Sequence, residues 1–286
     1  SSLEHISIGK SATTIDGSAF LNCSSLTYIN IPNSVTEIGY YTFMGCSSLK
    51  SITIPNSVTS IKSAIFRDCT SLTSVTIGNS VTTIGSGAFY GCSSLTSFTI
   101  PGSVTRIENS AFEECSSLTS ITIPDSVTHI GEGAFANCIS IKSFKGKFAS
   151  NDGRFLMRDN DSVLIAFAIN CGDTEYSILD GIPIIGSSAF KGSSLIRITI
   201  PNSVREIGNY AFENCKNLNI ITCKALTAPT TSSRTFGNST SNYTGYNTRG
   251  QNVLLVPRNS SGYETGYWDD PLCIADKCGF TLSKTL

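Results

Sequence analysis

The strongest constraint on the fold is a unit of 23 residues that repeats along the chain. Residues 72–92, with the sequence LTSVTIGNSVTTIGSGAFYGC, form one copy. Two residue types keep the interval: the cysteines Cys23, Cys46, Cys69, Cys92, Cys115 and Cys138, and the phenylalanines Phe20, Phe43, Phe66, Phe89, Phe112 and Phe135. A fixed period of roughly 20 to 50 residues predicts a solenoid, in which each repeat packs on its neighbours.

Each unit contains signals for two extended segments and a turn. Val75 and Ile77 alternate with polar residues, which predicts a strand with one buried face. The next position, Gly78 in this copy, is proline in four others: Pro32, Pro55, Pro101 and Pro124. Proline ends a strand there because it has no N–H to donate. Residues 81–85 then predict a second short strand, and residues 87–92 predict one helical turn.

One unit cannot fold alone. Its roughly eight apolar side chains contribute about 1.5–3 kcal/mol each when buried. Ordering the 23 residues costs about 1.5 kcal/mol apiece. Stacking must supply the difference, so the sequence predicts a continuous right-handed coil with parallel β-sheets. The expected fold class is an α/β repeat solenoid that is mostly β, with short helical turns.

The consensus LxxIxIPxxVxxIGxxAFxxC resembles the BspA-like class of leucine-rich repeats. The resemblance covers residues 3–144 without a gap and resumes at residues 176–223. Proteins of this class occur mainly on bacterial surfaces and in some parasitic protists, and we expect a Bacteroidetes member here. The resemblance implies a leucine-rich repeat coil that acts in adhesion to host proteins and in coaggregation. It implies no catalytic residues and no defined ligand motif.

The repeat is interrupted between residues 145 and 174. Two apolar runs, residues 155–158 and 163–167, flank a polar stretch, which predicts an inserted β-hairpin. The repeat pattern then resumes, because residues 178–190 align with residues 123–135. BspA-like proteins often carry such a hairpin with an LIAF segment, so the resemblance implies the same insertion.

The predicted domains are a leucine-rich repeat solenoid over residues 1–223, with the hairpin inserted at 145–174, and a C-terminal cap over residues 224–286. Residues 230–250 are rich in Ser, Thr, Asn and Gly, which predicts an irregular loop. Residues 253–257 predict the last strand.

The end of the cap contains aromatic residues that could lie along a closing helix. These are Tyr263, Tyr267 and Trp268, and Pro271 limits the length of such a helix. The pattern VP…Y…W resembles the closing segment of Bacteroidetes members of the family.

The 11 cysteines predict internal packing rather than a disulfide framework. In a stacked coil the six periodic cysteines form one internal column, with neighbours about 4.8 Å apart and side chains that point the same way. Parallel side chains do not favour a disulfide, and free cysteine packs as a small hydrophobe. No C-x₂-C pair suggests zinc. A disulfide among Cys223, Cys273 and Cys278 is left open.

Composition and motifs argue against several functional classes. The net charge is −1, which offers no basic footprint for nucleic acid, and no run of 18 apolar residues could span a membrane. The chain has two histidines, His5 and His129, and we interpret His129 as a solvent-facing repeat position. No nucleophile, phosphate-loop or metalloprotease motif occurs, so we expect no enzyme activity and no cofactor. Residues 159–161 begin like a calcium loop, but Leu164 and Asn170 replace the required glycine and glutamate.

The candidate ligand-binding surface is the outward face of the first strand of each unit. Ser and Thr fill most of its positions and make it flat and nearly uncharged. The candidate ligand-binding residues depart from this pattern: Tyr28, Asn30, Lys50, Lys142, Lys145 and Arg197. Solenoids use extended surfaces to bind partners. An inert exposed sheet face would show the same Ser and Thr, so both interpretations stay open.

These observations predict a non-catalytic protein that binds host or bacterial surface proteins or glycans. We expect a monomer with no nucleic-acid partner and no membrane span in this chain. The alternative function is a rigid structural spacer that presents another domain. The chain starts inside a repeat, so we expect an export signal upstream and an extracellular or cell-surface location.

Overall fold

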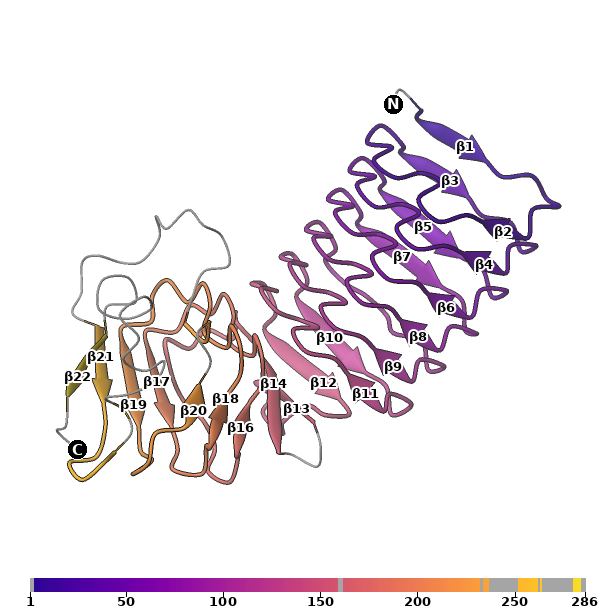
Figure 1. Cartoon of the computed structure of the whole chain (residues 1–286). Helices are drawn as coiled ribbons and strands as arrows, with labels where there is room; N and C mark the ends of the chain where they lie inside the picture. Colours follow the sequence, from indigo (N-terminus) through magenta and orange to yellow (C-terminus); the bar gives the residue numbers. More distant parts are fainter. Residues whose placement is uncertain are drawn as a thin grey trace. The chain divides into compact units, whose positions relative to one another are not determined.

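The computed structural model describes residues 3–158, 162–231, 234–236, 252–261, 263 and 280–283. The chain divides into two compact units, Ser1–Arg154 and Phe155–Leu286, called here the N-terminal and C-terminal units. Parallel β-sheets dominate both units, and the described residues include no α-helix (Figure 1). The predicted division between residues 223 and 224 stays a prediction, because most of the proposed cap lies outside the described residues.

One side of the N-terminal unit consists of the longer strands. Partner residues are one repeat apart, as in His5 beside Tyr28 and Ser51 beside Ser74. This parallel stacking confirms the predicted solenoid and follows from the alternation of apolar and hydroxyl side chains, which buries one face of each strand. The strands are β1 (His5–Ser7), β3 (Tyr28–Asn30), β5 (Ser51–Ile54), β7 (Ser74–Ile77), β10 (Ser120–Ile123) and β12 (Ser143–Gly146).

A second side consists of two-residue strands, each ending on a buried isoleucine. They are β2 (Thr14–Ile15), β4 (Glu37–Ile38), β6 (Ser60–Ile61), β8 (Thr83–Ile84), β9 (Arg106–Ile107) and β11 (His129–Ile130). Strands β6, β8, β9 and β11 form one sheet, and β2 pairs with β4. We call this side the short-strand face and the previous one the long-strand face. The residue before each isoleucine points outward, which gives the short-strand face its chemistry.

The third side of each rung is a chain of turns, so the predicted helical turn is wrong. Gly87 and Gly91 have φ values of 59° and 70°, in the left-handed region that an α-helix cannot contain. The backbone instead alternates between local turns and bonds to the next rung. The Tyr90 N–H donates to the Gly87 carbonyl at 3.1 Å, whereas the Phe89 N–H donates to the Ala111 carbonyl at 2.8 Å. These bonds between rungs replace those of a helix.

A continuous stack of phenylalanine rings fills the core of the N-terminal unit. Phe43 and Phe66 stack with ring centroids 5.5 Å apart, and Phe66 and Phe89 at 5.3 Å. Phe98 projects from the long-strand side and packs its edge on Phe89 at 4.9 Å. The 23-residue period therefore places identical rings in register and joins neighbouring rungs.

A column of thiols runs beside the rings. Cys69 Sγ lies 3.1 Å from the Phe43 carbonyl oxygen, and Cys92 Sγ lies 3.2 Å from the Phe66 carbonyl oxygen. Burial raises the pKa of Cys46 to about 12, and Cys23 in the preceding rung adds to the shift. The predicted free, buried thiols are confirmed for five periodic residues: Cys46, Cys69, Cys92, Cys115 and Cys138. Cys23 in the first rung is free but only half-buried.

We expect the buried thiols to resist alkylation. At pH 8 the Cys46 thiol stays protonated because its pKa is raised to about 12, and the packed rungs exclude the reagent. Iodoacetamide labelling followed by peptide mass spectrometry should modify Cys23 in the folded protein and leave Cys46 and Cys92 unmodified until denaturant is added. Equal labelling rates for Cys92 and Cys23 under native conditions would contradict the thiol column.

The C-terminal unit begins with the segment that the sequence analysis treats as an insertion. β13 (Phe155–Arg158) and β14 (Val163–Phe167) pair antiparallel, as expected for a hairpin. However, β14 also pairs parallel with β16 (Ile184–Ile185), and Phe167 stacks on Phe190 at 4.9 Å. Both strands are largely buried. The prediction of a hairpin inserted into one continuous coil is therefore not supported, because β14 supplies a core phenylalanine and acts as part of a rung.

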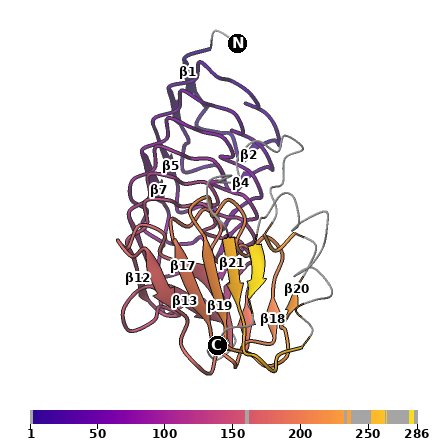
Figure 2. The same ribbon diagram turned by 90° about the vertical axis from the view of Figure 1, so that its left-hand side faces the viewer.

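The C-terminal unit contains two sheets. The short-strand sheet has the order β13-β14-β16-β18-β20, with β18 at Glu206–Ile207 and β20 at Thr230–Thr231. The long-strand sheet contains β15 (Glu175–Ser177), β17 (Arg197–Ile200), β19 (Ile220–Cys223), β21 (Asn252–Leu255) and β22 (Phe280–Ser283). Figure 2 shows β17, β19 and β21 side by side. The predicted strand near residues 253–257 is thus confirmed as β21, within the same sheet as the repeats.

Parts of the predicted cap lie outside the described residues, namely Tyr267, Trp268, Cys273, Cys278 and most of the loop at 230–250. The turn at residues 159–161 also lies outside them. Cys223 is a free thiol. The Tyr263 hydroxyl lies 3.0 Å from Cys223 Sγ and 2.8 Å from the Ala225 carbonyl oxygen. The buried Tyr263 therefore holds its segment against the rung that contains β19.

Candidate functional site

The long-strand face of the N-terminal unit exposes the hydroxyl side chains expected from the sequence. The second and fourth residues of β5 and β10 are buried, and the first and third, which are Ser and Thr, are exposed. Tyr28 pairs with His5, Asn30 with Ser7, and Lys145 with Thr122 in adjacent strands. The candidate residues of this unit are all exposed: Tyr28, Asn30, Lys50, Lys142 and Lys145.

These candidate residues do not form one compact site. Tyr28 and Lys142 belong to rungs that are five repeats apart, or about 24 Å at the spacing of parallel strands. Lys142 directly precedes β12 and Lys145 is its third residue, so both lie at one end of the face. Arg197 belongs to the C-terminal unit, where its Nε lies 3.0 Å from Glu175 Oε1. Among the basic candidate residues, the structure therefore brings together only Lys142 and Lys145, as a local basic patch, while Tyr28 and Asn30 share β3.

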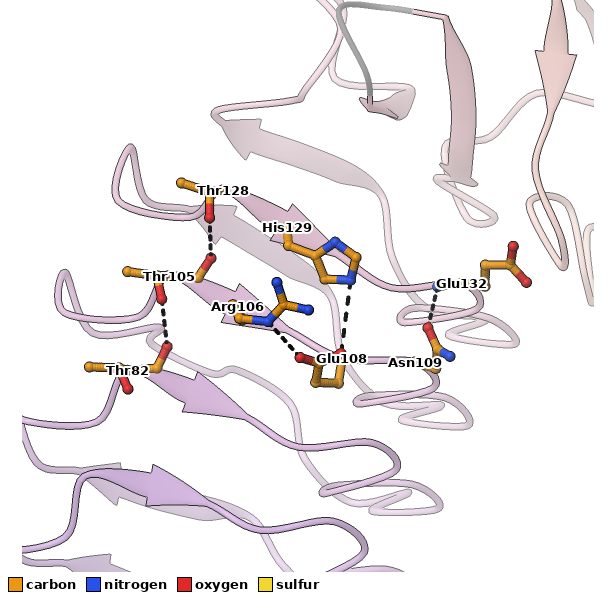
Figure 3. A network of polar contacts seen from close by, with 8 residues as sticks. All are labelled: Thr82, Thr105, Arg106, Glu108, Asn109, Thr128, His129 and Glu132. Atoms are coloured by element: carbon orange, nitrogen blue, oxygen red, sulfur yellow. Dashed lines mark hydrogen bonds and ion pairs between the residues drawn. The ribbon is translucent and has the colours of Figure 1, made fainter.

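The short-strand face contains a charged group that the sequence analysis did not single out (Figure 3). Arg106 Nε lies 2.8 Å from Glu108 Oε1. His129, one rung further along, has Nε2 at 3.8 Å from the other oxygen of the same carboxylate. The side chain of His129 is about one-third exposed, so its interpretation as a solvent-facing position is confirmed. Glu108 thus lies between a guanidinium and an imidazole on an exposed sheet.

A ladder of threonines lies beside this group in Figure 3. The Thr105 hydroxyl donates to the Thr82 carbonyl oxygen at 3.2 Å, and the Thr128 hydroxyl donates to the Thr105 carbonyl oxygen at 3.1 Å. On the other side, the Glu132 N–H donates to Asn109 Oδ1 at 2.9 Å. These bonds link successive rungs and hold the backbone under the charged side chains.

A second polar group lies on the same face, nearer the N-terminus. Lys62 Nζ lies 3.8 Å from Glu37 Oε1 and 5.7 Å from the centre of the exposed Tyr40 ring. The signal in the sequence was the residue before each isoleucine, as in Glu37 and Arg106, together with the first or second residue after it, as in Lys62, Glu108 and Tyr40. The pattern of the longer strand alone does not contain these positions.

The turn side contains a further interlocked group. The Arg67 guanidinium lies 4.1 Å from the centre of the Tyr90 ring, and the Tyr90 hydroxyl donates to Glu114 Oε1 at 2.9 Å. Burial, and then the hydrogen bond to Glu114, raise the pKa of Tyr90 to about 12. A phenol with a raised pKa is a poor base at neutral pH, and this group stabilises contacts between rungs.

The described residues offer little for catalysis or metal binding. No group of three or more His, Cys, Asp or Glu side chains among them could hold a metal ion. Burial raises the pKa values of the periodic thiols Cys69 and Cys115 well above the usual range, which makes them poor nucleophiles. Within the part of the chain that the structure describes, no helix has the length and apolar character needed to cross a membrane.

Comparison with solved structures finds bacterial leucine-rich repeat proteins. A leucine rich cell surface protein from Faecalibacterium prausnitzii is 25% identical, with a TM-score of 0.63 over 90% of this chain and 82% of that one. A leucine-rich repeat protein from Bacteroides ovatus is 30% identical, with a TM-score of 0.62 over 78% of this chain. This chain spans 64% of the length of the Bacteroides ovatus protein. No curated protein matches the chain.

The family assignment comes from a profile of the repeat itself. The profile, described as a BspA type leucine rich repeat region, matches in six copies over residues 1–116, 36–151 and 166–248. These ranges cover most of the chain and leave out residues 152–165, which contain β13 and the first three residues of β14. The parallel rungs, the stacked phenylalanines and this match agree, and the chain belongs to the BspA-type leucine-rich repeat family.

Proposed function

We propose that this protein is a non-catalytic binding module of the bacterial surface that adheres to a host or bacterial surface protein or glycan. The observation that carries the proposal is the long-strand face, a series of parallel strands with exposed hydroxyl side chains supported by a stacked core. The similarity to a cell surface protein of Faecalibacterium prausnitzii supports an extracellular location. We further propose that the chain acts as a monomer.

Within this proposal, the basic end of the long-strand face contributes most to ligand capture. Lys142 and Lys145 are exposed on either side of the buried Phe144 and have no acidic partner among the described residues. Their charges are therefore available to a partner with carboxylate, sulfate or phosphate groups. Tyr28, Asn30 and Lys50 extend the same face, whereas Arg197 is already paired with Glu175.

Reversing the charge at the basic end should weaken ligand binding. We expect the double variant Lys142→Glu/Lys145→Glu to bind at least about tenfold more weakly in 0.15 M salt, because attraction becomes repulsion at two exposed positions. Arrays of extracellular-matrix proteins, mucins and glycans identify a ligand, and surface plasmon resonance then gives the affinities. The matched control is Lys216→Glu/Lys224→Glu, which makes the same charge change at exposed positions of the C-terminal unit.

The alternative function is a structural spacer that presents another domain. The backbone bonds that join the rungs of the N-terminal unit favour it, because they make a stiff element from short repeats. A spacer would bind nothing on the arrays. Unchanged affinity in the double lysine variant would instead remove the basic end from the proposed binding surface.

A further inference from the structure

We infer that the short-strand face of the N-terminal unit is a second binding surface, which recognises a neutral glycan chain. This inference deepens the proposed function and rests on it, but it uses different residues on a different sheet. The surface consists of two exposed groups: Tyr40 with Glu37 and Lys62, and Arg106 with Glu108 and His129.

The spacing of the two groups suits an extended ligand. Lys62 follows β6 directly, Arg106 begins β9, and one rung, β8, lies between them. The groups are therefore about 10 Å apart at the spacing of parallel strands, a span that a chain of a few sugar units covers. On the intervening rung the outward side chains are the small Thr83 and Ser86, and Gly85 between them has no side chain, so no bulky residue separates the two groups.

The chemistry of the Arg106 group favours hydroxyl groups as ligands. The guanidinium, carboxylate and imidazole are planar, and the first two can each make two parallel hydrogen bonds, which matches adjacent hydroxyls on a sugar ring. Among the described residues, the ion pair to Glu108 uses only Nε of Arg106. An exposed pair of this kind stabilises a fold by at most about 1 kcal/mol. Folding therefore gives little reason to place three such side chains together.

The Tyr40 group adds an aromatic surface. The Tyr40 side chain is 53% exposed, and an exposed ring can stack on the C–H face of a sugar. Its hydroxyl and the Glu37 carboxylate, which pairs with the same Lys62, add hydrogen-bonding groups. Tyr41 beside it is also exposed, and exposed rings among polar groups are the combination that an amphipathic sugar requires.

Charge and exposure argue against other partners for this face. The formal charges of Glu37, Lys62, Arg106 and Glu108 cancel, so the surface offers no net attraction to polyanions. Protein interfaces usually centre on several apolar or aromatic anchors. From β6 to β11, this face exposes no large hydrophobic side chain among the described residues. Among the described residues, a peptide would find aromatic anchors at one end only, at Tyr40 and the neighbouring Tyr41, whereas a neutral glycan finds hydrogen-bonding groups at both ends.

The test uses the full chain on an array of neutral and acidic oligosaccharides, followed by titration with the neutral glycans that bind. We expect Tyr40→Ala and Glu108→Ala each to weaken neutral-glycan binding by about tenfold or more. Tyr40→Phe, which keeps the ring, should retain most of the affinity. The control Lys216→Glu/Lys224→Glu should bind as the parent does. All these positions are on the surface, and thermal unfolding should confirm that each variant stays folded.

The outcomes separate this inference from the proposed function. Neutral-glycan binding that falls in Tyr40→Ala and Glu108→Ala supports the second surface. Glycan binding that these variants leave unchanged, but that Lys142→Glu/Lys145→Glu abolishes, overturns the second surface and keeps the long-strand face. If the chain binds proteins on the arrays but binds no glycan, the second surface is also overturned, while the proposed adhesion function stands.

Discussion

Replacing Phe89 with alanine should destabilise the N-terminal unit by about 3–5 kcal/mol. Phe89 is fully buried and stacks on Phe66 and Phe112, with ring centroids 5.3 Å away on each side. Phe98 forms a T-shaped pair with Phe89, with ring centroids 4.9 Å apart. The substitution leaves a cavity that touches three rings, and the bonds between rungs prevent the backbone from closing it. Urea denaturation followed by circular dichroism measures the loss.

The matched control is the same substitution at the end of the stack. Phe20 is only half-buried and stacks on Phe43 at 5.4 Å. We expect Phe20→Ala to cost clearly less than Phe89→Ala, because fewer contacts and less buried area are lost. Equal losses at the two positions would show that stacking between rungs does not determine the stability of the solenoid.

Removing the charge of Lys191 should destabilise the C-terminal unit by about 3–5 kcal/mol. Lys191 Nζ lies 2.9 Å from Glu213 Oε2, and the two side chains are 11% and 0% exposed. In Lys191→Met the methylene packing is kept, but the Glu213 carboxylate stays buried without this cation. Burying an unpaired charge is far more costly than losing an exposed ion pair. The free energy of unfolding from urea titration tests this expectation.

A double-mutant cycle isolates the ion pair from packing. We expect Lys191→Met/Glu213→Gln to recover part of the stability lost in Lys191→Met, because the neutral amide costs less to bury than a carboxylate. The exposed pair of Arg197 and Glu175 provides the comparison, and Arg197→Met should cost no more than about 1 kcal/mol. Additive effects at Lys191 and Glu213 would contradict a coupled buried pair.

Much of the fold could be predicted from the repeat. The 23-residue interval, the buried phenylalanines and cysteines, and the parallel stacking of the long strands were all predictable, because every rung repeats the same pattern of apolar residues. The turn side was not, since Gly87 and Ser110 occupy the same repeat position and both have φ near 60°. A non-glycine residue rarely adopts such an angle without tertiary support, so local propensity favoured a helix there.

The candidate surfaces were only partly predictable. The outward direction of Lys145 follows from strand alternation beside the buried Phe144, which is a local property, whereas Lys142 lies just before β12. The meeting of Arg106, Glu108 and His129 depends on register, because residues 23 positions apart become neighbours only after the rungs stack. Likewise, the LIAF segment at residues 164–167 looks in the sequence like an addition to the coil. The pairing of β14 with β16 and the stacking of Phe167 on Phe190 make it part of the core of the C-terminal unit.

By itself, then, the amino-acid sequence determined which side chains are buried, how the rungs repeat and which family the chain belongs to, since burial of a periodic apolar pattern has one favourable solution. Only the tertiary structure decided the left-handed turns, the division at Arg154 and Phe155, and the polar groups of the short-strand face. Those features arise from contacts between rungs. The energies of these contacts depend on the register and spacing of the stacked rungs, and the sequence of one repeat does not specify either.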